Sequence, residues 1–442
     1  MSFVVLTLRG LFGLFVLTGI AYLFSMNRKA INWRLVGIGI GLQLVFALLV
    51  LKTAPGAALF RSIGGGFSRL LSYTYVGSDF IFGSLGIPPG QEGSFGFVFA
   101  FQVLPTIVFF ASLMGILYHF KVVQPLVKGM GWFMAKTLGI SGAESLSAAA
   151  NVFIGQTEAP LVVKPYIQSL TKSELMTLMT GGMATIAGGV LAAYILFLGG
   201  PDLDQQAIFA GHLLSASIMS APAAIVMAKI LVPETTTPKT MGNVEMIIER
   251  TEVNGIEAAA AGAADGLKLA LNVGAMLLAF LCLLALANGI LGWIGKPTLF
   301  GATPYDLNAV IATASGGAFS GLSMEAIFGY VFSPLAWAMG VESADILQFG
   351  RLLGEKIAVN EFLAYTSLGE LKGVVSDRTI IIGTYALCGF ANFSSIAIQI
   401  GGIGPIAPER RSEIASLGVR AVIGGALASW MTATIAGVLI AG

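Results

Sequence analysis

The sequence predicts an all-α protein that crosses a membrane several times and also contains re-entrant helical hairpins and interfacial helices. Hydrophobic residues make up 56% of the 442 positions, and charged residues only 11%. The mean hydropathy of +0.86 is far above that of a soluble chain. A short polar motif that contains a glutamate also interrupts apolar sequence once in each half of the chain. Apolar spans with a repeated polar interruption are typical of inverted-repeat transporter folds.

The apolar spans follow from the thickness of a membrane. A hydrocarbon core of about 30 Å requires roughly 20 apolar residues in a helix. The first uncharged stretch is followed by Arg28 and Lys29 and has no small-residue cleavage site, so we expect a retained helix and not a signal peptide. Eight such stretches are predicted to be transmembrane helices: 10–27, 35–51, 94–118, 175–201, 205–228, 269–295, 379–408 and 421–442.

Two further kinds of element lie between these spans. Residues 121–136 and 322–340 place charged or polar residues among apolar ones in a helical rhythm, which predicts helices lying in the membrane interface. Each precedes an apolar segment that is interrupted by Gly, Pro or Asn, at 144–170 and 345–371. We interpret these two segments as re-entrant hairpins. An odd number of crossings between them would insert the second half upside down relative to the first.

These elements predict a domain organisation and an orientation. Loops that share one side are richer in Lys and Arg, which favours both termini on the periplasmic side, although basic clusters are often only topological anchors. Cys282 and Cys388 lie in apolar spans, where we expect them to pack and not to form a disulfide. The net charge of +1 gives no reason to expect nucleic-acid binding. The predicted units are scaffold and interfacial helices (1–143), a first transport repeat (144–232), a partly helical cytoplasmic linker (233–268), further scaffold and interfacial helices (269–343) and a second transport repeat (344–442).

The hairpin motifs carry the candidate site for a polar ligand. "GQTEAPLVVKPY" (155–166) and "GEKIAVNEFLAY" (354–365) share a Gly, a Glu and a final Tyr. A carboxylate at the bilayer centre costs at least about 2.5 to 3.5 kcal/mol, so Glu158 and Glu361 must face a cavity, a partner or a ligand. Gln156 and Thr157 add a donor and acceptors that suit the edge of a polar heterocycle. Alternatively, these groups only cap the hairpin tip.

Two other polar groups accompany the hairpins. Glu361 beside Asn360, together with Asn392 and Ser395, could bind vicinal hydroxyls, or could only join packed helices by hydrogen bonds. Asn151 and Thr185 offer a carbonyl and a hydroxyl near "GGMATIAGG" (181–189), where unwound backbone could complete an oxygen shell for sodium. The alternative is that these glycines only allow close helix packing.

The motifs resemble those of the concentrative nucleoside transporter family. "GEKIAVNEFLAY" is similar to the family signature of Gly, any residue, Lys, three residues and then Asn-Glu-Phe-Val-Ala, with Leu363 in place of Val. "GQTEAPL" and "TYALCGFANFSS" are similar to two other family signatures, and the resemblance covers the chain from residue 35 onward. It implies a bacterial inner-membrane homotrimer that imports nucleosides such as uridine, cytidine and adenosine by an elevator-like mechanism.

The resemblance also implies residue roles, with no catalytic residue and no cofactor. Sodium is the coupling ion that it favours, and proton coupling is the alternative, since some bacterial relatives are proton-driven. Thr185 stands where family members often have Ser. The implied contacts are the nucleobase for Gln156, Thr157, Glu158 and Val190, the ribose for Glu361, Phe390, Asn392 and Ser395, and sodium for Asn151, Ile154, Thr185 and Ile186.

Two other classes of protein compete with this interpretation. An intramembrane enzyme would use paired carboxylates or a serine nucleophile, and "GISG" (139–142) does fit a Gly-x-Ser-Gly pattern at Ser141. Four residues in a Gly- and Ser-rich chain are weak support, and a turn is the simpler interpretation. A channel would present an open filter in place of two hairpins with a sugar-like set of hydrogen-bonding groups.

Overall fold

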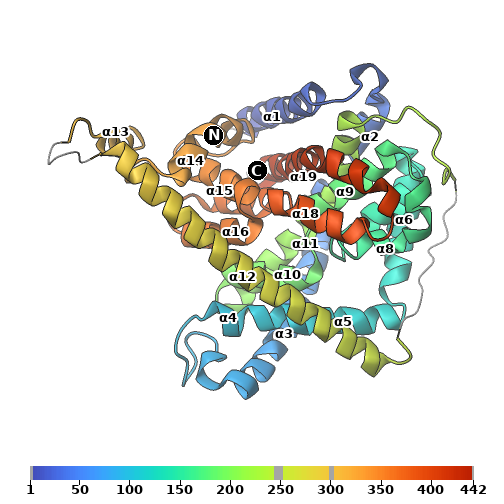
Figure 1. The fold of residues 1–442 in the computed structure, drawn as a ribbon, viewed down its shortest axis with the longest axis horizontal. Helices are drawn as coiled ribbons and strands as arrows, with labels where there is room; N and C mark the ends of the chain where they lie inside the picture. The colour runs from blue at the N-terminus through green and yellow to red at the C-terminus, as the bar shows by residue number, and fades with distance from the viewer. Residues whose placement is uncertain (1–2, 243–251, 298–302, 441–442) are drawn as a thin grey trace.

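The computed structural model describes residues 3–242, 252–297 and 303–440 and confirms the all-α fold. Every named element in these ranges is helical, and the β pairing there is limited to one isolated bridge between Lys372 and Val375. The two ends of the chain lie close together where α1 packs against α19 (Figure 1). In that contact a Cβ at Gly10 would lie 2.2 Å from Cγ2 of Val438. The Val438 side chain therefore packs directly on the α1 backbone at Gly10.

The N-terminal helices start at capping residues. Asn32 accepts a hydrogen bond from the amide of Leu35 at the start of α2, and Thr53 accepts one from Gly56 at the start of α3. Each cap satisfies an amide that has no partner within its helix. The bounds are α1 Phe3–Leu23, η1 Arg28–Ala30, α2 Trp33–Lys52, α3 Ala54–Phe82, η2 Gly83–Leu85, α4 Phe99–Gln102 and α5 Leu104–His119.

The spans predicted from the sequence do not include α3. Its 29 residues contain Arg61, Arg69 and Asp79, so it lacks a long uncharged stretch. Small residues pack it against α11, since a Cβ at Gly64 would lie 2.2 Å from the carbonyl oxygen of Ala207. Hydropathy alone misses this helix because its buried side is built from small and hydroxyl residues.

Helices are present at both segments that we predicted to be interfacial, with slightly shifted bounds. They are α6, Val123–Leu138, and α14, Met324–Ala338. Helix α6 is amphipathic: Val127 and Met134 are buried, whereas Lys128 and Trp132 are exposed. It ends at Gly139, whose φ of 65° lies in the left-handed region that glycine adopts without strain.

The first repeat contains a hairpin followed by a broken helix. The predicted hairpin 144–170 is regular only in its first arm, because its second arm is divided into two short pieces. The predicted span 175–201 is interrupted at residues 185–187. The bounds are α7 Gly142–Asn151, α8 Ala159–Val162, η3 Lys164–Ser169, α9 Lys172–Ala184, α10 Gly188–Gly199 and α11 Leu203–Leu231.

The second repeat has the same order of elements. Its hairpin has two regular arms, and the helix that follows is interrupted at residues 387–392. The predicted span 379–408 is therefore made of two short helices. In the described part of the chain, seven other helical stretches are long and apolar enough to cross a membrane. The bounds are α15 Ile346–Ala358, α16 Glu361–Glu370, α17 Asp377–Ala386, α18 Phe393–Ile403, η4 Pro408–Arg410 and α19 Arg411–Ile440.

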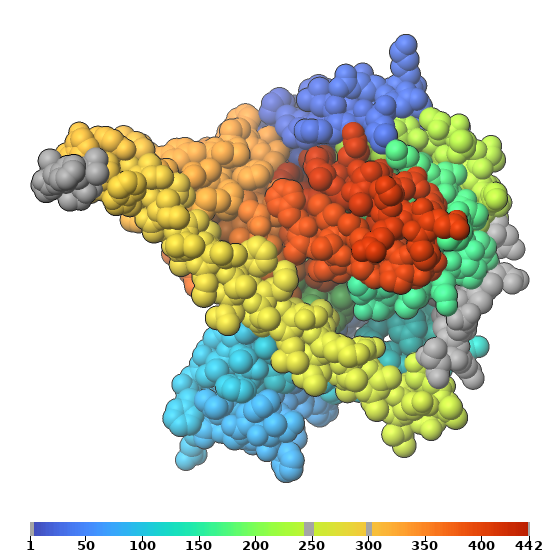
Figure 2. Space-filling model, in the orientation of Figure 1, coloured from blue at the N-terminus to red at the C-terminus, as the bar shows by residue number. Residues whose placement is uncertain are grey.

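A single long helix connects the two halves. Helix α12 spans Gly255–Gly295, so residues 255–268 of the predicted linker belong to it, while residues 243–251 lie outside the described residues. It crosses one face of the molecule obliquely, from α5 toward α13, Leu307–Ala314 (Figure 1). Figure 2 shows it as a yellow ridge on the surface. Cys282 is exposed on this helix and is not packed as we expected.

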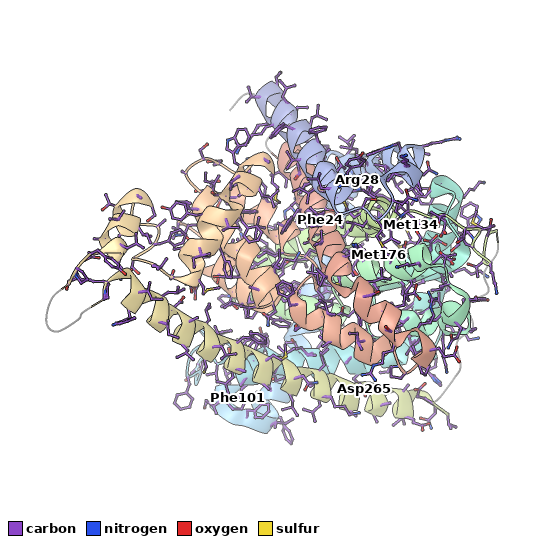
Figure 3. All side chains as sticks on the ribbon, turned by 45° about the horizontal axis from the view of Figure 1, so that its top comes forward. Phe24, Arg28, Phe101, Met134, Met176 and Asp265 are labelled. Carbon is purple, nitrogen blue, oxygen red and sulfur yellow. The ribbon has the colours of Figure 1, made fainter. Side chains whose placement is uncertain are left out.

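The interior lies between the two repeats and not beneath α12. Met176 on α9 is fully buried and lies among side chains from several helices, whereas Asp265 lies on the outer helix α12 (Figure 3). The second helix break also lies here. Gly389 has a φ of 115°, and a Cβ at this position would lie 2.6 Å from the carbonyl oxygen of Met183. The second break thus packs directly on the end of α9.

The close contact between α3 and α11 predicts a stability effect. Gly64→Ala is expected to destabilise the protein by about 1 to 3 kcal/mol, because the added methyl collides with backbone that cannot move aside. Gly66→Ala is the matched control, since a Cβ there meets nothing within 4 Å. Thermal unfolding in detergent would check the pair. Equal melting temperatures for the two variants would contradict this packing.

Candidate functional site

The tip of hairpin 1 presents three polar side chains after α7 ends. A Cβ at Gly155 would lie 2.3 Å from Oε2 of Glu158, so only glycine allows this carboxylate to fold back beside the tip. Thr157 donates to Oε1 of Glu158 at 3.0 Å. Gln156 is buried, whereas Glu158 is exposed.

A chain of hydrogen bonds connects hairpin 1 to hairpin 2. Gln156 Nε2 donates to Ser395 Oγ at 3.1 Å, and the Ser395 amide donates to Asn392 Oδ1 at 2.9 Å. Asn392 Nδ2 in turn donates to Glu361 Oε2 at 2.9 Å. Tyr194 of α10 donates to the other carboxylate oxygen at 3.1 Å. The structure thus brings four of the predicted residues together, all of them buried.

Helix N-termini position two of these groups. Asn392 is the N-cap of α18 and accepts from the Ser395 amide, which leaves its amide nitrogen free to donate to Glu361. Asn360 is the N-cap of α16 and accepts from the Leu363 amide at 3.0 Å. Asn360 therefore caps a helix, a role that we did not predict for it. Glu361 lies in the first turn of the same helix, where a negative charge is favourable.

Tyr194 and Gln399 extend this network and were not predicted. Gln399 Nε2 donates to Gln156 Oε1 at 3.2 Å and to the Met179 carbonyl at 2.9 Å. The sequence did contain a signal, since each residue lies one helical turn after a predicted site residue, at Val190 and at Ser395. Residues at i and i+4 on a helix share a face.

The two predicted apolar site residues flank the breaks. Val190 is buried in the first turn of α10, on the same side of the helix as Tyr194. Phe390 is partly exposed within the second break, and its carbonyl accepts the Asn392 amide at 2.9 Å. Both residues therefore lie next to members of the hydrogen-bonded chain.

The predicted cation ligands come together at the first break. Asn151 is the last residue of α7, and among the described residues no group donates to its buried Oδ1. A Cβ at Gly181 would lie 3.1 Å from Asn151 Nδ2, which places α9 directly against it. Thr185 follows α9 in an extended conformation and bonds the Gly181 carbonyl at 2.9 Å.

The donor set at this break suits a hard cation. It consists of a side-chain carbonyl, a hydroxyl and the backbone near Ile154 and Ile186, both of which are buried. Oxygen atoms of this kind in unwound helices are the usual ligands of coupling ions in transporters. In the described part of the chain, no group of three or more His, Cys, Asp or Glu residues could hold a metal ion.

Ser141, the candidate nucleophile, has structural partners. It forms a capping box with Glu144 at the start of α7, and its hydroxyl donates to Glu174 Oε1 at 2.6 Å. Lys229 pairs with Glu144 in the same buried cluster and donates to Ser173 Oγ at 2.9 Å. The Ser141 hydroxyl thus holds a helix N-terminus against α9.

Models of three protein families match successive parts of the chain. They are described as "Na+ dependent nucleoside transporter N-terminus" at residues 12–85, "Nucleoside recognition" at residues 100–201 and "Na+ dependent nucleoside transporter C-terminus" at residues 212–437. The C-terminal model alone covers about half of the chain, including hairpin 2 and both parts of the second broken helix.

Curated relatives match over nearly the whole chain. An uncharacterized transporter of Bacillus subtilis (strain 168) is 44% identical over 432 residues, which cover 98% of this chain and 99% of the relative. Human solute carrier family 28 member 3 is 41% identical over 443 residues, covering 97% of this chain and 59% of the relative. Mouse sodium/nucleoside cotransporter 1 is 39% identical, covering 97% and 63%.

The fold is similar to solved structures of CNTnw. An inward-facing substrate-bound state of that protein matches with a TM-score of 0.85 at 41% identity, covering 98% of this chain and 99% of the other. An outward-facing state of a variant matches with a TM-score of 0.84 at 40% identity, covering 98% of each chain. From these matches and the motifs that its hairpins bring together, the chain belongs to the concentrative nucleoside transporter family, whose members are transporters and not enzymes.

Proposed function

We propose that this protein is a symporter that imports nucleosides across the bacterial cytoplasmic membrane, driven by a sodium gradient. The observation that carries this proposal is the buried hydrogen-bonded chain from Gln156 to Tyr194, which joins both hairpins and both broken helices. Such a site at the junction of two repeats is where secondary transporters bind their substrates. The family's description as Na+ dependent supports sodium, and a proton gradient is the alternative.

The two ends of the hydrogen-bonded network suit the two parts of a nucleoside, the base and the ribose. Gln156, Thr157 and Glu158 combine an amide with acceptor oxygens, which matches the donors and acceptors on the bases of uridine, cytidine and adenosine. Val190 supplies an apolar surface for the base. The exposed Glu158 is the group that an arriving base would reach without breaking the bonds of the buried chain.

The ribose would bind at the other end. Glu361 has two acceptor oxygens, and Asn392 and Ser395 add donors and acceptors around it. Hydroxyls of the sugar would replace the hydrogen bonds that these side chains now make to each other. Phe390, which is partly exposed beside Asn392, would pack against the sugar.

Sodium would bind at the first break, to Asn151 and Thr185 through their side chains and to the carbonyls of Ile154 and Ile186. The buried Oδ1 of Asn151 supports this site, because it lacks a donor among the described residues. An ion there would order the hairpin tip that presents Gln156, so ion and nucleoside would each improve the binding of the other. One charge moving through about 100 mV supplies about 2.3 kcal/mol, enough for accumulation of tenfold or more.

An elevator-like homotrimer is the proposed architecture. The two repeats (144–232 and 344–442) would move as a transport domain against a scaffold that includes α5 and α12. Helix α12 supports a role in assembly, because few of its residues are buried in the single chain and it presents the exposed side chains of Leu278, Leu286 and Ile290. The contact between α1 and α19 fits our placement of both termini on one side, which we propose to be the periplasmic side.

Uptake of radiolabelled uridine into proteoliposomes tests this function. We expect accumulation under an imposed sodium gradient and none under a proton gradient alone. Accumulation only with a proton gradient would retain the substrate and discard the sodium site. Absence of saturable uptake under both gradients would refute the proposed transport activity, and flux without saturation would indicate a channel.

The proposed ribose site predicts the behaviour of Glu361→Gln. This change replaces one carboxylate oxygen with an NH2 group, which removes an acceptor for the ribose hydroxyls. When the new amide points its NH2 group at Asn392 Nδ2, two donors face each other. We therefore expect uridine uptake to fall at least about 100-fold. The variant should still elute as a folded species in size-exclusion chromatography. Glu370→Gln is the matched control, because Glu370 is exposed at the other end of α16 and should retain activity. Normal uptake by Glu361→Gln would contradict the ribose role.

The proposed sodium site predicts a different phenotype for Asn151→Ala. Loss of the side-chain carbonyl should raise the sodium concentration for half-maximal uptake about tenfold or more. Ser145→Ala on the same helix serves as the control, since the Ser145 hydroxyl donates to the Gly142 carbonyl within its own turn. Sodium titrations of uptake would compare the two variants. An unchanged sodium response in Asn151→Ala would exclude this residue as a ligand.

A further inference from the structure

The interior of the second repeat contains a lysine that the proposed transport site does not use. Lys356 lies on α15 in the first arm of hairpin 2 and has no exposed surface. Its Nζ donates to the carbonyl of Ala386 at 2.8 Å, to the carbonyl of Cys388 at 3.3 Å and to Ser429 Oγ at 2.7 Å. An ammonium has three N–H donors, so these three oxygen atoms satisfy it completely.

The acceptors belong to the second helix break. Ala386 is the last residue of α17, and Cys388 lies within residues 387–392 between α17 and α18. Carbonyls at the end of a helix lack intrahelical partners and carry the negative end of the helix dipole, which attracts a cation. Tyr365 of hairpin 2 also donates to the Thr384 carbonyl at 2.8 Å. The arms of hairpin 2 thus hold the end of α17.

The first repeat has the opposite arrangement at the equivalent place. There the first arm of hairpin 1 ends in Asn151, whose buried Oδ1 is an acceptor without a donor among the described residues. Asn151 packs against Gly181 in the last turn of α9, and Thr185 begins the first break directly after this helix. Both places lie between the first arm of a hairpin and the break in the following helix. Repeat 1 offers oxygen atoms to a cation, and repeat 2 contains its own cation.

We propose that the Lys356 ammonium is a tethered cation, which takes in repeat 2 the place that the coupling cation takes in repeat 1. This inference rests on the proposed function for the identity of the cation site. Lys356 is a positioning residue: it fixes Ala386 and Cys388, and four residues after Cys388 the chain reaches Asn392, the N-cap of α18 and partner of Glu361. The sugar side of the site is therefore held in place without an external ion.

Hydrogen–deuterium exchange of the purified, full-length protein tests the proposal without any nucleoside. In the unchanged protein, sodium should slow exchange about the first break (184–190) and leave the second break (386–396) unaffected. In Lys356→Met, the second break should exchange at least tenfold faster, with the response of the first break to sodium preserved. Unchanged exchange at residues 386–396 in this variant would overturn the proposal, and so would sodium protection of the second break in the unchanged protein.

Binding of radiolabelled uridine in saturating sodium provides the functional readout. We expect Lys356→Met to weaken binding at least tenfold, while the sodium midpoint, measured without nucleoside as a rise in melting temperature, stays within twofold. If the uridine affinity and the sodium midpoint changed by the same factor, this would indicate a general loss of structure and overturn the positioning role. If Lys356→Met does not fold, Ser429→Ala removes one acceptor of the ammonium and should give a smaller loss with the same selectivity. Failure of the unchanged protein to bind uridine would instead refute the proposed function, and the exchange experiment would still decide the role of Lys356.

Discussion

Backbone groups inside a membrane protein must find hydrogen-bond partners within the protein, and the centre of this structure depends on that constraint. Two of its helices are interrupted, at residues 185–187 and 387–392. The interruptions are tolerated because they lie in the interior, where Gly389 of the second packs on Met183 at the end of α9, just before the first. Lys356 and Tyr365 of hairpin 2 donate to carbonyls at the second interruption and at the end of the helix before it. The polar site is thus a consequence of where the helices break.

The same constraint connects the two repeats. Each hairpin contributes a polar side chain that is satisfied by the other repeat: Gln156 reaches Ser395, and Glu361 accepts from Tyr194. Removing one partner from a buried pair leaves the other group unsatisfied, at a cost of about 1 to 3 kcal/mol. A ligand that offers its own hydroxyls and amide edge avoids this cost while it separates the pairs. The network is therefore stable while its side chains bond to each other, and these hydrogen bonds can still be replaced by hydrogen bonds to a ligand.

Much of this arrangement could be predicted from the sequence, because hairpins and breaks leave a local mark. Gly, Pro, Asn and Glu in apolar surroundings identified both hairpins, and the motifs identified Glu361 and Asn392. Helix α3, which packs through Gly64, was missed because its charged residues interrupt the uncharged stretch by which the other spans were identified. Tyr194 was missed because a tyrosine in an apolar span is commonly a packing residue. Its role depends on the carboxylate of a segment far away in the sequence, which composition and periodicity do not reveal.

The two repeats differ in how their breaks are held, and this difference suits coupled transport. If both breaks were held by resident groups, the site would form without an ion and nucleoside could move uncoupled. If both needed an external cation, two ions would have to bind before any nucleoside. With Lys356 bound to the second break, only the first break would need an ion under the proposed function. Under the proposed function, the sugar side of the site would then always be in place, whereas the base side would form only when the ion binds. A single ion is then enough to make nucleoside binding depend on a cation.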